Sequence, residues 1–274
     1  MTKILALAGA KSSGKSTACN VVLGWELSSL GLIDDFNIAE DGKLLIHEAG
    51  QPPNQFVLMD TFTNNPEVRA WLDEKVHPYV KIYSFGDAIK QLCVNLLGIE
   101  HKLIHGSEAD KNTLTHLRWE DMPGIATEET LSIGYADIGY KHFKLEYHPP
   151  DPMTIREVMQ YVGTNIFRRM YAPVWINACM NQIQAEGSQF ALISDVRFTD
   201  ETNAVRDAGG KVISLTRAPY AHLDKHESEN GLIGAVFDHV IDNKNVPIDS
   251  MSRELYAKLR EWGFLEYEIM FGES

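Results

Sequence analysis

Short apolar runs alternate along the chain with longer stretches in which apolar residues recur every three or four positions. A short apolar run predicts a buried strand, and the longer spacing predicts an amphipathic helix. The predicted strands are residues 4–8, 80–85, 190–194, 212–215 and 239–241. The predicted helices are residues 17–30, 87–97, 154–171, 175–186, 200–208 and 250–262. This alternation indicates an α/β fold in which a five-stranded parallel sheet lies between two layers of helices.

Two stretches interrupt the alternation, at about residues 34–66 and 119–152. The first contains the turn sequence EDGK at 40–43 between two β-like segments, followed by a Pro-Pro break. The second is rich in aromatic residues, which include Tyr135, Tyr140, Phe143 and Tyr147. We expect both to be β-rich insertions, built as hairpins that pack beside the core of a single domain spanning residues 1–274. A homodimer through the second insertion is an alternative to simple packing on the core.

The net charge of the 274-residue chain is −13. A protein that binds duplex DNA usually carries a basic stripe, which this sequence lacks, and an acidic balance disfavours anionic membranes. No apolar run approaches the length of a membrane span. Lys3 and the apolar residues after it mimic a signal peptide, but the run is short and a glycine-rich loop follows, so we expect no cleaved leader. The sequence therefore predicts neither a nucleic-acid partner nor a membrane partner.

The cysteines, Cys19, Cys93 and Cys179, are isolated from one another. This spacing favours a reducing cytoplasm and argues against disulfides or a zinc site. Two histidine pairs, at 101/105 and 222/226, have the spacing of one helical turn. Without a third ligand nearby, we interpret both pairs as ordinary surface histidines.

The most specific motif is GAKSSGKST at 9–17, directly after the first predicted strand. The pattern Gly-x4-Gly-Lys-Ser is typical of a phosphate-binding loop, in which glycines let backbone N–H groups turn toward phosphate oxygens. The positive end of the following helix adds to that attraction. Lys15 is expected to reach the β- and γ-phosphates of a nucleotide, and the Ser16 hydroxyl to bind Mg²⁺.

A second set of candidates lies on the predicted helix 154–171. One face is apolar, and an adjoining face carries Arg156, Gln160, Gly163 and Thr164. A glycine inside a helix lowers helix stability by about 1 kcal/mol relative to alanine. Its presence here indicates that another group approaches the helix backbone closely. Arg168 and Arg169 follow, and adjacent arginines in an acidic protein are candidates for bidentate phosphate contacts.

Charged residues also follow the predicted strand 190–194. Asp195 and Arg197 come just after it, and Glu201 follows four residues later. Ligands of open α/β sheets bind outside the carboxyl ends of the strands, so these side chains are candidates for the same site. A salt bridge to a neighbouring loop is the alternative.

The chain resembles the bacteriophage deoxynucleoside monophosphate kinases, a branch of the P-loop nucleoside monophosphate kinases. The resemblance rests on the order and spacing of several blocks. They are GAKSSGKST at 9–17, SFGDAIK at 84–90, GSEADKN at 106–112, TIREVMQYVGTNIFR at 154–168, Trp175, SDVRFTDE at 194–201 and HESENGL at 226–232. The two insertions fall outside it. The resemblance implies ATP-dependent phosphorylation of a deoxynucleoside monophosphate to its diphosphate, with Mg²⁺, for phage DNA precursor synthesis.

The resemblance also implies roles for single residues. ATP and Mg²⁺ would be held by Gly9, Ser13, Gly14, Lys15, Ser16 and Thr17. The monophosphate would be bound by Lys11, Ile89, Lys90, Lys111, Arg156, Gln160, Gly163, Thr164, Trp175, Asp195, Arg197 and Glu201. Lys15, Arg168 and Arg169 would neutralise the charge that develops during transfer. Lys111 stands where family members often have arginine, so it keeps the charge but loses the planar fork. Some members have aspartate in place of Ser16.

Other functions compete with this one. A related kinase could act on a hydroxymethylated base in DNA, which the acidic charge disfavours. A GTP-binding switch usually carries Asn-Lys-x-Asp, whereas this chain has NKNV at 243–246. A purely structural ATP-binding module would have no need of the arginine-bearing helix.

Overall fold

The computed structural model describes residues 2–47, 52, 55–63, 65–126, 146–219 and 231–269. The chain divides into two compact units. The first unit contains residues 1–85 and 176–274, and the second contains residues 86–175. Along the described ranges, no helix combines the length and apolar character needed to span a bilayer.

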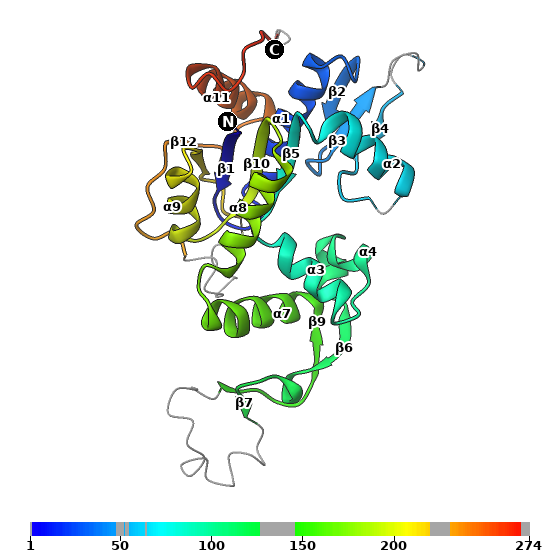
Figure 1. Cartoon of the computed structure of the whole chain (residues 1–274), viewed down its shortest axis with the longest axis vertical. Helices are drawn as coiled ribbons and strands as arrows, with labels where there is room; N and C mark the ends of the chain where they lie inside the picture. Colours follow the sequence, from blue (N-terminus) through cyan, green and yellow to red (C-terminus); the bar gives the residue numbers. More distant parts are fainter. Residues whose placement is uncertain are drawn as a thin grey trace. The chain divides into compact units, whose positions relative to one another are not determined.

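The first unit is built on a five-stranded sheet whose strands are all parallel (Figure 1). Its strands are β1 (Lys3–Ala8), β5 (Val80–Tyr83), β10 (Phe190–Val196), β11 (Lys211–Leu215) and β12 (His239–Ile241). Their order across the sheet is β12-β11-β1-β10-β5. The predicted α/β fold is therefore confirmed, and each strand lies within two residues of its predicted bounds.

Helices cover both faces of this sheet. The helices α1 (Lys15–Ser29) and α11 (Ile248–Glu261) pack on one face, and α8 (Val174–Glu186) and α9 (Thr199–Asp207) pack on the other. Side chains of β1 alternate between the two cores, with Leu5 and Leu7 in one and Ile4 and Ala6 in the other. Burial on both faces explains why the inner strands β1, β10 and β11 read as mostly apolar runs.

The first insertion forms a small antiparallel sheet on the same side as α1. Its strands are β2 (Asp35–Ile38), β3 (Leu44–His47) and β4 (Val57–Leu58), followed by the helix α2 (Pro66–Trp71) and the π-helix η1 (Leu72–Val76). The predicted turn at 40–43 does join β2 to β3. Leu44 and Ile46 belong to the core that α1 helps to form, so this insertion packs beside the core as expected. Residues 48–51, 53, 54 and 64 lie outside the described residues.

The second unit consists of short helices and strands around its own apolar core. Its elements are α3 (Asp87–Asn95), α4 (His101–Ile104), α5 (Glu108–Lys111), β6 (Leu114–Arg118), the 3₁₀ helix η2 (Trp119–Asp121), β7 (Ile125–Ala126), β8 (Glu146–Tyr147), β9 (Pro152–Thr154), α7 (Ile155–Gln160) and the π-helix η4 (Tyr161–Arg168). β6 pairs antiparallel with β9 on either side of the second insertion.

The single helix predicted over 154–171 is wrong in detail. Thr154 ends β9 and caps the next helix, because its hydroxyl accepts from the N–H of Glu157 while the Glu157 carboxylate accepts from the N–H of Thr154. α-Helical hydrogen bonding then gives way to π-helical bonding at Tyr161. A π-helix bonds residue i to i+5, so α-helical spacing does not place residues beyond 161 on the predicted face.

The described ends of the second insertion also differ from the expected hairpin. β7 pairs with β8 in parallel, whereas the arms of a hairpin pair antiparallel. Residues 127–145 between them, with Tyr135, Tyr140 and Phe143, lie outside the described residues, as does most of the block at 226–232.

Candidate active site

The carboxyl ends of the central strands bring distant segments to one edge of the first unit's sheet. Ala8, the last residue of β1, pairs with Val196 of β10 on one side and with Ser214 of β11 on the other. The connection after β1 leads past β10 to β5, while the connection after β11 leads the opposite way to β12. Neighbouring strands whose connections diverge open a crevice at their carboxyl ends, which is the usual ligand site of such sheets.

The loop after β1 has the conformation that its glycines were predicted to allow. Gly9 has φ +142°, and a Cβ there would lie 2.7 Å from the carbonyl oxygen of Leu215. Gly14 has φ +100° and is the N-cap of α1. Any side chain at Gly9 would therefore meet backbone, and the left-handed cap at Gly14 suits glycine.

Lys15 lies against the loop itself. Its Nζ donates to the carbonyl oxygens of Gly9, at 2.8 Å, and Ala10, at 2.6 Å, and the residue is only 7% exposed. Ser13 is buried beside it, with Oγ 3.4 Å from Nζ. The ammonium is thus fixed within the loop. The other predicted loop residues, Lys11, Ser16 and Thr17, are half-buried or exposed.

Two residues that the sequence did not single out for this site support the loop from β11 and β12. Asn243 is buried, and its Nδ2 donates to the carbonyl of Ser13 at 2.7 Å. Its Oδ1 accepts from the backbone N–H of Arg217 at 2.9 Å. The Arg217 guanidinium donates to the carbonyl of Ser12 through Nε, at 3.2 Å, and NH2, at 3.1 Å. A polar residue two positions after a predicted strand was the available signal for Asn243.

Asp195 joins the ends of β10 and β5. Its carboxylate accepts from the Ser84 hydroxyl at 2.5 Å and from the Phe85 N–H at 2.8 Å. Cys19 of α1 lies within electrostatic reach of both Asp195 and Lys15. Burial is the main cause that raises the pKa of its thiol, Asp195 raises it further, and Lys15 opposes the change. A carboxylate and an ammonium therefore lie at the same edge of the sheet.

Glu201 has a different environment from the one expected of a ligand-binding carboxylate. It is 4% exposed, and its Oε2 accepts from the backbone N–H groups of Arg197, at 2.7 Å, and Phe198, at 3.0 Å. These contacts cap the N-terminus of α9, where a carboxylate is stabilising. Its carboxylate holds the backbone of half-buried Arg197, another predicted substrate residue.

In the second unit, Lys90 and Lys111, two of the predicted substrate residues, lie within electrostatic reach of His105. Burial is the main cause that lowers the pKa of His105 to about 4, and the charges of Lys90, His101 and Lys111 lower it further. The rings of His101 and His105 stack with centroids 4.3 Å apart. His101 and His105 are both half-buried, so the pair is less exposed than the interpretation as ordinary surface histidines implies. The pair at 222/226 lies outside the described residues.

The side chain of Arg156 reaches α5 from α7. Its NH2 lies 2.5 Å from Oε2 of Glu108, and the side chain is 23% exposed. Ser107 and Asp110 form a capping box that starts α5, and a Cβ on Gly106 would lie 2.5 Å from the Asp110 carboxylate. The block at 106–112 therefore builds the short helix that carries Lys111 and that holds Arg156 through Glu108.

Trp175 packs inside the second unit. Its Nε1 donates to the carbonyl of Gly163 at 3.0 Å, and the residue is 8% exposed. A Cβ on Gly163 would lie 3.8 Å from Ile89 and 3.9 Å from Trp175, both ordinary contacts. The structure thus brings Ile89, Gly163 and Trp175 together. Gln160, Thr164 and Arg168 are half-buried, and Arg169 is exposed at the end of η4.

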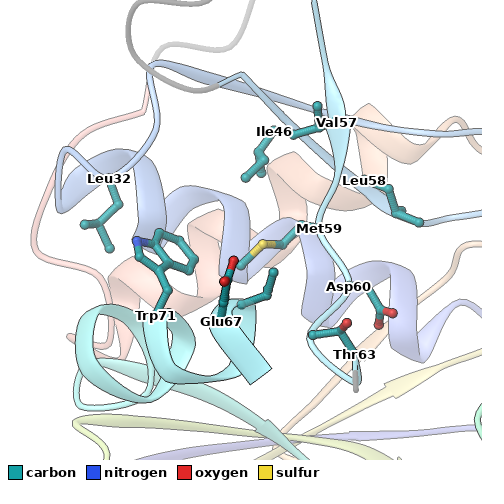
Figure 2. Close-up of a pocket in the computed structure, with 10 residues that line it drawn as sticks. Leu32, Ile46, Val57, Leu58, Met59, Asp60, Thr63, Glu67 and Trp71 are labelled. Atoms are coloured by element: carbon teal, nitrogen blue, oxygen red, sulfur yellow. The ribbon is translucent and has the colours of Figure 1, made fainter. Parts of the chain in front are cut away.

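A separate pocket of about 700 Å³ lies beside the small antiparallel sheet of the first unit (Figure 2). Its lining comes from β3, β4 and α2 and from neighbouring residues: Leu32, Ile46, Val57, Leu58, Met59, Asp60, Thr63, Glu67, Val68 and Trp71. None of the predicted site residues is among them. Across the described residues, no group of three or more His, Cys, Asp or Glu is placed to hold a metal ion.

Comparison with known proteins assigns the chain to a family. No curated protein matches the chain. The family model for deoxynucleotide monophosphate kinase matches residues 102–255, which is more than half of the chain. This range contains the residues predicted to bind the acceptor from Lys111 to Glu201, while the phosphate loop at 9–17 lies before it and is an independent observation. The chain belongs to the deoxynucleotide monophosphate kinase family, and it is a phosphotransferase.

Proposed function

We propose that this protein transfers the γ-phosphoryl group of ATP to a deoxynucleoside monophosphate, giving the diphosphate and ADP. The observation that carries this proposal is the phosphate loop, in which Lys15 is held at the carboxyl edge of a parallel sheet behind two glycines with positive φ. The family match supplies the acceptor class. The diphosphate would serve DNA precursor synthesis.

The loop residues suit ATP with Mg²⁺. Gly9 admits no side chain, because a Cβ there would lie 2.7 Å from the carbonyl oxygen of Leu215. A loop of this kind can turn its backbone N–H groups toward phosphate oxygens. Ser16 is exposed in the first turn of α1, next to Lys15, and Asp195 supplies a carboxylate at the neighbouring strand end. Hydroxyl and carboxylate oxygens are the ligands that Mg²⁺ prefers. When bound, the ion would neutralise phosphate charge.

The basic residues of the second unit suit the acceptor. Lys90 and Lys111 lie within electrostatic reach of His105, which stays neutral at pH 7, and Arg156 is positioned by Glu108. We propose that these residues bind the monophosphate, with Gln160, Thr164 and Trp175 beside its base. For Lys11, Asp195 and Arg197 of the first unit, we keep the substrate-binding role that the resemblance implies as a proposal. Glu201 would act through the backbone of Arg197.

The chemistry requires no covalent intermediate on the protein. An oxygen of the acceptor phosphate forms a bond to the γ-phosphorus, and the bond from that phosphorus to the β–γ bridging oxygen breaks, so ADP leaves with the electron pair. Catalysis of this step is mostly positioning and charge neutralisation. Lys15, Arg168 and Arg169 are the groups we propose to neutralise the transferring phosphoryl group.

A turnover assay with labelled ATP tests this function. The wild-type protein should phosphorylate at least one deoxynucleoside monophosphate, and it should leave DNA containing hydroxymethylated bases unlabelled. Lys15→Ala should lower kcat by roughly a hundred- to a thousandfold, because one preorganised charge is worth about 3–4 kcal/mol. Lys258→Ala, which changes a lysine paired with Glu261 on α11, is the matched control. A folded Lys15→Ala protein with wild-type turnover would reject the assignment.

A further inference from the structure

We infer that the turn at 39–43, in the first insertion, is a positioning element for the phosphate loop. The inference rests on the proposed function, since it assumes that the loop binds ATP. It gives the first insertion a part in nucleotide binding, although the sequence offers no phosphate-binding pattern there and predicts a peripheral role.

The turn is a short hairpin loop that places a glycine against α1. Ala39 donates its N–H to the carbonyl of Lys43 at 2.9 Å, and Gly42 donates to the carbonyl of Ala39 at 2.8 Å. Gly42 has φ +83°, which completes a three-residue hairpin loop with glycine in the left-handed position. Gly42 is also buried, which is unusual for the tip of a surface hairpin.

What buries Gly42 is the first turn of α1. A Cβ on Gly42 would overlap Oγ1 of Thr17 and lie 3.3 Å from Cβ of Thr17. Asn20, one turn further along α1, donates from Nδ2 to the carbonyl of Gly42 at 2.9 Å. The turn is therefore held by contact with one residue of the phosphate-loop motif and by a hydrogen bond from the next turn of the helix.

The contact continues along the helix. A Cβ on Gly24 would lie 2.5 Å from Cδ2 of the Phe36 ring, on β2. The ring therefore packs directly against α1 at Gly24. Thr17, Asn20 and Gly24 are spaced i, i+3 and i+7, so they form one stripe on α1. The hairpin lies along this stripe for about two turns. A helix braced in this way cannot rotate or shift without breaking several contacts at once.

The braced stripe begins in the part of α1 that matters for nucleotide binding. Lys15, Ser16 and Thr17 are consecutive residues of its first turn, whose N–H groups and side chains form the phosphate site. Asn243 fixes the same loop through the carbonyl of Ser13. The turn and Asn243 therefore each hold this segment through a separate contact, one at Thr17 and the other at Ser13.

Gly42→Ala tests the inference. The new methyl group must displace Thr17, and we expect the Kd for ATP to rise at least tenfold, while the Kd for a deoxynucleoside monophosphate changes less than twofold. Gly31→Ala is the matched control, because Gly31 has a similar positive φ, +67°, but no atom within 4 Å of the added Cβ. This control should bind ATP like the wild type, although alanine in a left-handed conformation destabilises both variants.

Asn20→Ala provides a milder second variant. It removes the hydrogen bond to Gly42 without adding a group, and we expect the Kd for ATP to rise about threefold with the monophosphate Kd unchanged. ATP binding is measured by calorimetry on the full chain, and melting temperatures show whether each variant is folded. If Gly42→Ala does not fold, the Kd of Asn20→Ala for ATP tests the inference.

The outcomes separate this inference from the proposed function. Folded Gly42→Ala with the ATP affinity of Gly31→Ala would overturn the inference, as would Asn20→Ala with wild-type affinity. A purely structural role for the turn would lower the melting temperature without changing the ATP affinity of the folded protein, and it would also overturn the inference. Failure of the wild-type protein itself to bind ATP would instead reject the proposed function.

Discussion

Asn243 donates from its amide Nδ2 to the backbone carbonyl of Ser13 at 2.7 Å, and both residues are buried. The bond joins the segment after the last strand of the central sheet to the phosphate loop after the first. The Asn243 Oδ1 also accepts from the N–H of Arg217, whose guanidinium donates to the carbonyl of Ser12. Residues that lie more than two hundred positions from the loop in the sequence thus help to hold its shape.

We expect Asn243→Ala to weaken ATP binding about three- to tenfold, because a hydrogen bond contributes roughly 0.5–1.5 kcal/mol. The Kd for the monophosphate should change little. Calorimetric titration with each nucleotide measures both effects. Asn245→Ala, two residues away and exposed, is the control and should bind ATP like the wild type. An equal loss of affinity for both nucleotides would show that Asn243 acts on the whole protein and not on the loop.

Arg156→Ala should weaken monophosphate binding by about 1.5–3 kcal/mol, the range for a hydrogen bond to a charged group, and leave ATP binding nearly unchanged. Glu108 is the matched position, since its carboxylate lies 2.5 Å from the Arg156 guanidinium. Glu108→Gln removes the charge that positions Arg156 but keeps the shape of the side chain. Monophosphate affinity should therefore fall in that variant, by less than in Arg156→Ala. A larger loss of ATP affinity than of monophosphate affinity in Arg156→Ala would contradict the acceptor role.

Stability should depend on His105 below neutral pH. The pKa of His105 is lowered from 6.5 to about 4 in the folded protein. Between pH 4 and pH 6.5 the unfolded chain binds a proton at His105 that the folded chain does not. This contribution to the free energy of unfolding is therefore present above pH 6.5 and is lost as the pH falls toward 4. Half-burial and solvent screening limit the loss to about 1 kcal/mol at pH 5.

The matched variant for this effect is His105→Gln, which keeps a polar side chain and cannot titrate. Between pH 7 and pH 5, the melting temperature of the wild type should fall by about 2–4 °C more than that of the variant. Thermal melts at both pH values measure the difference. Parallel pH dependence in the two proteins would show that His105 does not carry the charge change.

The second insertion should tolerate shortening. Tyr161 donates its hydroxyl to the carbonyl of Pro123 at 2.7 Å, and Trp119 stacks on His148 with centroids 4.1 Å apart, so the base of the insertion is tied to the second unit. Replacing only residues 127–145 with a Gly-Ser linker leaves these contacts in place. We expect kcat to stay within about tenfold, a barrier change of about 1.4 kcal/mol.

Steady-state kinetics and a melting curve test this replacement together. A stable variant that had lost phosphoryl transfer would assign residues 127–145 to the active site. Comparing the oligomeric state of the two proteins in solution would also decide between packing on the core and a dimer through this insertion.

The sequence by itself determined the elements and their chemistry where the causes are local. Burial on both faces makes each central strand a short apolar run, and the loop at 9–17 needs glycine at fixed positions whatever surrounds it. The turn at 40–43 was predictable for the same reason, because glycine after Glu-Asp suits a hairpin loop. These features depend on hydrogen bonds and burial within a few residues.

Only the tertiary structure decided which distant groups meet. No spacing along the chain places Asn243 on Ser13 or Gly42 on Thr17, because these contacts depend on the order of strands in the sheet and on how an insertion packs on α1. Glu201 reads from sequence as a ligand, and in the structure its Oε2 accepts from two backbone N–H groups. Trp175 likewise donates to Gly163, in a helix whose π-helical turn shifts every later residue from its predicted face. A side chain's type limits what it can do, and its packed neighbours determine which of those roles it has.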